Sequence, residues 1–159
     1  MAKQGKEKLS PDQPYAEAIA ALIAERWSDV WKAVPAAIDG DDIEGVHAVR
    51  VASRRLRAAM DVAADCFPTG WYKPLHGAAK EITGALGAVR DRDVLLEFLA
   101  AERASVPAQE RPGLDRLIAK IEGERNAARA KMTAFFSALS DRGIEAEAAR
   151  RFAAAGGGR

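Results

Sequence analysis

The chain has 159 residues, of which 48% are hydrophobic and 30% are charged, and its formal net charge is +1. This length and apolar content suit one globular domain with its own core. No stretch approaches the roughly 20 apolar residues of a membrane-spanning helix. The lone cysteine, Cys66, excludes an internal disulfide and fits a cytoplasmic protein. Because the net charge is small, any anion binding must depend on local clustering of cations.

Helical periodicity and abundant alanine predict an all-α fold, an up-down bundle of four long antiparallel helices with a short C-terminal helix. Residues 1–13 lack periodicity and are expected to form a flexible tail, followed by a single domain over 14–155 and a flexible tail over 156–159. The first helix is expected over 14–34, ended by Pro35 and then Gly40. The second follows an N-cap at Asp41 or Asp42 and ends near Cys66. The others are expected over 71–104, 108–139 and 144–154.

Basic side chains without any acid fill the stretch from Gly45 to Met60. On a helical wheel, positions spaced by three and four residues share one stripe, and apolar residues lie opposite. Like charges at these spacings repel by about 0.2–0.5 kcal/mol per pair in an isolated helix. The stripe is therefore unfavourable until an anion or an acidic partner binds. Its members are His47, Arg50, Arg54 and Arg57.

Lys80 and Arg90 lie near one stripe of the third predicted helix. Gly84 and Gly87 interrupt that helix, where each glycine costs up to about 1 kcal/mol relative to alanine. Such a cost indicates the close approach of another backbone or of a ligand. Acids and bases alternate over residues 90–93, which indicates either a self-paired exposed face or an acid, Asp91 or Asp93, that orients an arginine.

Arginines on the apolar sides of two helices are further candidates. Arg125 and Arg129 lie on the inward side of the fourth predicted helix, where they either line the same anion site or extend their charged ends to solvent. Arg26 on the first helix has the same two interpretations. Arg55 is about a quarter-turn from the main stripe, so it either joins the site or pairs with an acid.

Two motifs resemble the signature of the CHAD family of α-helical domains. The first is Val46-His47-x-x-Arg50-Val51-x-x-Arg54-Arg55-Leu56-Arg57, and the second is Leu86-Gly87-x-x-Arg90-Asp91-x-Asp93-Val94-Leu95. Their order and their helices match the family over about residues 14–140. The resemblance implies a non-catalytic domain that binds inorganic polyphosphate through a basic groove, in the cytoplasm and in association with polyphosphate granules. No metal and no cofactor are expected, because the sequence lacks clustered carboxylates or histidines.

By motif position, the resemblance assigns polyphosphate binding to six basic residues and an orienting role to Asp91. Wheel geometry adds Lys80, Arg125 and Arg129 to the site. Arginine suits this ligand, because its planar fork donates two hydrogen bonds to phosphate oxygens. The six motif residues are His47, Arg50, Arg54, Arg55, Arg57 and Arg90.

Family members usually contain two four-helix bundles facing each other across the groove, whereas this chain is long enough for one. Either the chain is a truncated unit or two copies pair with two-fold symmetry and rebuild the groove. We favour the homodimer, which predicts that a monomer binds polyphosphate poorly.

Other functions fit the residues less well. Nucleic-acid binding is disfavoured because the basic stripe has neither Asn or Gln nor interleaved aromatics. A phosphotransfer histidine is disfavoured because Val51, one turn after His47, would restrict access to the ring. A hydrolase is disfavoured because clustered carboxylates and a phosphate loop are missing and because His47 and His76 lack ligand spacing. A structural bundle whose charges are simply solvated, or a partner-protein module, remains an alternative.

Overall fold

The computed structural model describes residues 10–157, and these form five α-helices without a strand. The all-α prediction is therefore confirmed. No helix in the described part of the chain is long and apolar enough to cross a membrane. In chain order the helices are α1 (Tyr15–Asp39), α2 (Glu44–Val62), α3 (Thr69–Ser105), α4 (Arg111–Asp141) and α5 (Ile144–Gly156).

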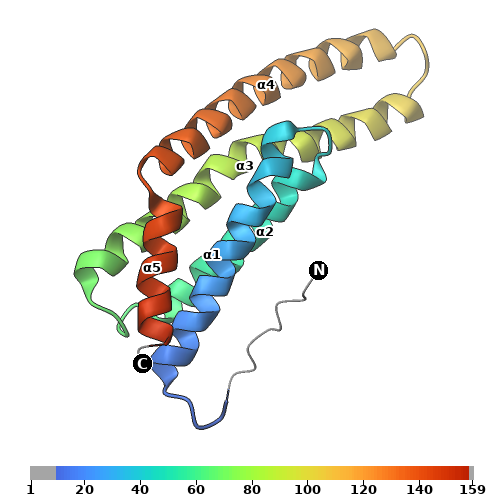
Figure 1. The fold of residues 1–159 in the computed structure, drawn as a ribbon. Coiled ribbons are helices and arrows are strands. Elements are labelled where there is room, and N and C mark those ends of the chain that lie inside the picture. Colours follow the sequence, from blue (N-terminus) through green and yellow to red (C-terminus); the bar gives the residue numbers. More distant parts are fainter. Residues whose placement is uncertain (1–9, 158–159) are drawn as a thin grey trace, which may run out of the picture.

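The helices pack mainly on their neighbours in the chain. α1 packs on α2 and on α5, α2 packs on α3, and α3 packs on α4 (Figure 1). The C-terminal half of α3 and the N-terminal half of α4 extend beyond the other helices as a helical hairpin (Figure 1). The core lies between α1, α2, α5 and the halves of α3 and α4 outside the hairpin. Its fully buried members include Ile23, Val49, Leu56, Leu86 and Phe152.

An aromatic cluster closes the end of the bundle opposite the hairpin. Phe152 of α5 packs edge-on against Phe67, Trp71 and Tyr72 at the α2–α3 connection, with ring centroids between 5.3 and 6.1 Å apart. The Tyr72 hydroxyl donates a hydrogen bond of 2.5 Å to the carbonyl of Met60. Burial raises the pKa of this phenol above its ordinary value. These contacts fix where α3 begins relative to α2.

The connection between α1 and α2 sets the start of α2. Gly40 adopts a left-handed conformation, with φ of 75°, and its N–H bonds the carbonyl of Ala36. The N-cap of α2 is Ile43 rather than Asp41 or Asp42 as predicted, although the Asp42 carboxylate accepts a hydrogen bond of 2.9 Å from the N–H of Glu44. A Cβ at Gly45 would lie 2.5 Å from the Ala36 carbonyl oxygen, so only glycine allows this approach of the two helices.

Some predicted boundaries were wrong. Pro35 does not end the first helix, since the chain remains helical through it to Asp39, and Gly40, the second predicted terminator, ends the helix. α2 ends at Val62 rather than near Cys66. Gly156, predicted to begin a tail, is the last residue of α5. The rest of the predicted tails lies partly outside the described residues, at 1–9 and 158–159.

Candidate functional site

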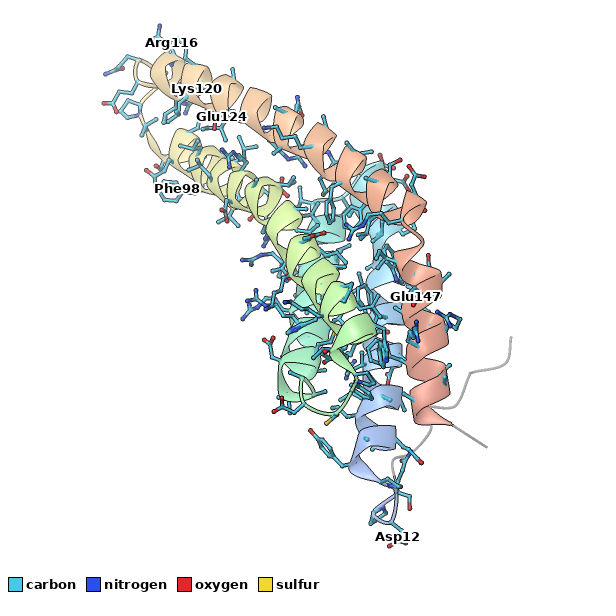
Figure 2. All side chains as sticks on the ribbon, turned by 90° about the vertical axis from the view of Figure 1, so that its left-hand side faces the viewer. Asp12, Phe98, Arg116, Lys120, Glu124 and Glu147 are labelled. Carbon is cyan, nitrogen blue, oxygen red and sulfur yellow. The ribbon has the colours of Figure 1, made fainter. Side chains whose placement is uncertain are left out.

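A row of cations follows α2 and continues onto the adjoining face of α3. We define the cationic row as His47, Arg50, Arg54 and Arg57 of α2 together with Lys80 and Arg90 of α3. His47, Arg50 and Arg90 are half-buried, and the other three are exposed. In Figure 2, nitrogen-ended side chains project from α2 and α3 on the side of the molecule away from α1 and α5.

The antiparallel register of α2 and α3 brings the two parts of the row together. The Thr83 hydroxyl donates to the Ser53 hydroxyl at 3.3 Å, so these residues lie at the same level. Because the two helices run in opposite directions, one turn after Ser53 on α2 lies level with one turn before Thr83 on α3, which places Arg57 level with Lys80. One to two turns in the other direction place His47 and Arg50 near the level of Arg90. The row therefore has cations on both sides of the α2–α3 seam.

A contact between a histidine and an aspartate ends the row at the Tyr72 side. The ring nitrogen Nε2 of His76 lies 2.6 Å from Oδ1 of Asp61. His76 lies one turn before Lys80 on α3, and its partner Asp61 lies near the end of α2, 15 positions earlier in the chain. With an acid at this level, the surface stops being purely cationic, so the site is bounded by Arg57 and Lys80 on this side.

Side chains of the row form no ion pair and no hydrogen bond with another described residue. Arginines elsewhere behave differently: Arg92 pairs with Glu124, Arg103 with Asp115 and Arg142 with Glu81. Arg150 and Arg151 share Glu147, and they hold the pKa of that carboxyl below its ordinary value. The concentration of unpaired cations on one seam indicates a binding surface rather than an ordinary mixed surface.

Three nitrogen atoms of the row are buried without a hydrogen-bond partner among residues 10–157. They are Nδ1 of His47, Nε of Arg50 and Nη1 of Arg90. Leaving a buried polar atom unpaired costs about 1–3 kcal/mol. These atoms lie at the end of the row where α2 begins. A phosphate oxygen can satisfy these atoms only if their side chains rotate toward the surface.

The glycines of α3 leave the surface low beside the row. A Cβ at Gly84 or at Gly87 would meet nothing within 4 Å. Close approach of another described backbone is therefore not the reason for either glycine, which removes one of the two explanations expected from the sequence. The open space lies between Lys80 and Arg90, where a ligand would contact the helix backbone directly.

Arg125 and Arg129 have partners inside the protein. Nε of Arg125 donates to Oδ1 of Asp93, a carboxylate that is 2% exposed. Nη2 of Arg129 donates to the carbonyls of Ala37 and Ile38 at 3.1 and 3.0 Å, at the C-terminal end of α1. Their inward placement agrees with the wheel, but both guanidinium groups serve packing contacts. We therefore leave both residues out of the row.

The remaining candidates also take different places. The acid that orients an arginine is Asp93, whereas Asp91 is exposed and has no ion-pair partner among the described residues. Arg26 pairs with Asp29 of α1 at 3.1 Å and is not part of the row. Arg55 is exposed and lies roughly 100° around α2 from Arg54, on the flank away from α3.

Metal-binding clusters are missing from the described part of the chain: no group of three or more His, Cys, Asp or Glu side chains is arranged to hold an ion. Comparison with known proteins gives one informative match. The model of the CHAD domain family matches residues 21–157, which is nearly the whole chain. No curated protein and no solved structure matches. The extent of the family match shows that the chain belongs to the CHAD domain family.

Proposed function

We propose that this protein binds inorganic polyphosphate through the cationic row and acts as a binding module rather than as an enzyme. One observation carries the proposal: the cations of the α2–α3 seam have no acid partner among the described residues, whereas most other arginines do. Membership of a family associated with polyphosphate binding supports the choice of ligand. We expect the protein in the cytoplasm, in association with polyphosphate granules.

The geometry of the row suits a linear polyanion. Successive turns of an α-helix present side chains about 5.4 Å apart, so a phosphate chain lying along the seam meets a cation at each turn. Arg50, Arg54 and Arg57 can each donate two hydrogen bonds to phosphate oxygens. Gly84 and Gly87 leave the seam open on the α3 side. No base edge has to be read, so aromatic and amide side chains are not needed at this surface.

We also propose that two chains pair, so that one polyphosphate contacts two rows. A long ligand held by two linked sites binds more tightly than it does at either one, because the second contact is intramolecular. A monomer is accordingly expected to bind long polyphosphate weakly.

The test is a titration of the full chain with long-chain polyphosphate, repeated for the double variant Arg50→Glu/Arg54→Glu. The matched control is Lys32→Glu/Arg150→Glu, which changes the net charge equally but lies on α1 and α5. We expect tight binding by the wild type and the control, and loss of binding by the row variant with unchanged helicity. Equal binding by the row variant and the wild type would falsify the proposal.

A competition experiment distinguishes polyphosphate from nucleic acid. Single-stranded RNA of matched charge is added to the complex of protein and polyphosphate. We expect RNA to displace polyphosphate only at a large molar excess. If RNA displaces polyphosphate at equal charge concentration, the row is a general polyanion site and the assigned ligand is wrong.

A further inference from the structure

The projecting hairpin of α3 and α4 exposes a cluster of large apolar side chains. Val94, Leu95 and Phe98 of α3 are 48%, 39% and 58% exposed, and Leu117 of α4 is 41% exposed. We call these four residues the hairpin patch. Elsewhere in the described chain, the other large exposed apolar residues are Tyr15 and Val62, which lie apart from the hairpin. Figure 2 shows Phe98 projecting outward from α3 near the tip of the hairpin.

A groove continues the patch toward the bundle. It lies between α3 and α4, has a volume of about 520 Å³, and is lined mainly by small or apolar side chains, among them Ala85, Ala88, Ala127 and Phe135. Small residues on two adjacent helices leave room for the side chains of a third helix to pack between them. The patch and the groove together form the hairpin face, and its groove also carries the paired Arg92 and Glu124 and the unpaired Lys131.

The unpaired charges of the hairpin differ between its two helices. Among residues 91–105 of α3, the charged side chains without an ion-pair partner in the range 10–157 are the acids Asp91, Glu97 and Glu102. On α4 the bases Arg116, Lys120 and Lys131 are likewise unpaired, with Glu122 as an unpaired acid, whereas Arg92 and Glu124 in the groove pair with each other. A partner that matches this face must therefore present bases opposite α3 and acids opposite α4. A second hairpin, rotated by 180° about an axis parallel to the helices, presents the bases of its α4 opposite α3 and the acids of its α3 opposite α4.

We propose that a second copy of this chain docks on the hairpin face, with α3 of each copy lying over α4 of the other. The ion pair between Arg103 and Asp115 fixes the register of the hairpin and places Glu102 level with Arg116. The two-fold axis then sets Glu102 of each copy opposite Arg116 of the other, and this contact occurs twice. An axis perpendicular to the helices would instead place α3 on α3 and its acids near one another.

The proposed contact specifies the surface through which two chains pair. In this respect it rests on the proposed function, which includes that pairing. Gly84 lines the groove and also lies between Lys80 and Gly87 beside the cationic row. A docked copy would therefore lie next to the row, within reach of the same polyphosphate chain. The contact itself depends only on the hairpin, so it can be tested without polyphosphate.

Self-association is measured by sedimentation equilibrium of the full chain over a range of concentrations. We expect the wild type to form a dimer and Phe98→Glu to weaken the association roughly 30-fold or more, as for a buried aromatic at the centre of an interface. The matched control is Tyr15→Glu, since Tyr15 is also 58% exposed and lies away from the hairpin. Circular dichroism verifies that both variants fold.

Charge reversal tests the orientation of the two copies. Glu102→Arg and Arg116→Glu are each expected to be monomeric alone, because every intermolecular pair becomes a pair of like charges. An equal mixture of the two variants restores both contacts and is expected to form a dimer. A monomeric wild type, or a dimer that Phe98→Glu leaves intact, overturns the proposed contact. A monomer that still binds polyphosphate leaves the proposed binding through the cationic row standing and overturns only the pairing of chains, whereas a dimer that does not bind overturns the binding function alone.

Discussion

The dependence of binding on salt gives a quantitative test of the cationic row. Five of its members carry a permanent positive charge, namely Arg50, Arg54, Arg57, Lys80 and Arg90. With a coefficient of about 0.7 per neutralised phosphate, as for single-stranded nucleic acids, the logarithm of the binding constant should fall with the logarithm of salt concentration with a slope of about −3.5. Raising the salt from about 50 mM to about 200 mM should then weaken binding about 100-fold.

Arg50→Gln/Arg54→Gln removes two of these charges without adding acids. Its slope is expected to be about −2.1, and the same change in salt should weaken its binding only about 20-fold. The assay is isothermal titration with long-chain polyphosphate at several salt concentrations. Arg142→Gln/Arg150→Gln, on the C-terminal side of the fold, serves as the control and should keep the wild-type slope. A row variant with the wild-type slope would refute the assignment, since its missing guanidinium groups could not have faced phosphates.

Four further changes test separate contacts. Asp93→Ala leaves a partly buried guanidinium without its acid and should lower the free energy of unfolding in urea by about 3 kcal/mol; a loss below about 0.5 kcal/mol would contradict this role. Arg129→Met removes two hydrogen bonds to the end of α1, so it should cost about 2 kcal/mol and leave the salt slope unchanged. Gly84→Ala should raise the free energy of unfolding by about 0.5–1 kcal/mol, because its Cβ meets open space, whereas Gly84→Trp should weaken polyphosphate binding by filling the surface beside the row. The hydrogen bond from Arg103 lowers the pKa of Asp115 in the folded protein. This carboxylate therefore stabilises the fold at pH values above its pKa in the unfolded chain, and the contribution is lost as the pH falls through its pKa in the folded protein. Asp115→Asn should lower Tm at neutral pH and match the wild type in acid, and an equal difference in Tm at both pH values would contradict this.

The positions of the row on α2 could be predicted because they depend on one helix alone. His47, Arg50, Arg54 and Arg57 share a stripe whenever the segment is helical, and α2 spans all four. Their relation to Lys80 and Arg90 depends on the register of two helices. That register is set by contacts such as the Ser53–Thr83 hydrogen bond, whose residues are 30 positions apart. A wheel gives the angle of a side chain on its own helix and contains no information on such a register.

Arg125 and Arg129 illustrate the same limit. The wheel placed both on the inward side of the fourth helix, and both are indeed partly buried. Their partners are 32 and about 90 residues away, on α3 and at the end of α1. An inward arginine needs some acceptor, but only the packing of α4 decides whether this is a ligand, an acid or a helix end. The interpretation as ligand-binding residues was reasonable from the sequence, and the structure supports a packing role for both.

Apolar periodicity also cannot separate contacts within one chain from contacts between chains. Leu117 belongs to the same apolar stripe of α4 as Met132 and Phe136, yet Leu117 is 41% exposed while the other two are buried. No large apolar residue lies between Ile121 and Met132, and the surfaces that cover the two parts of the stripe differ, because α4 leaves the bundle in its N-terminal half (Figure 1). Apolar side chains that no other helix of the same chain buries are most simply explained by burial against another molecule. The unpaired charges of Glu102 and Arg116 agree with our proposal that a second copy provides this cover, and the mixing experiment tests that proposal before any ligand is added.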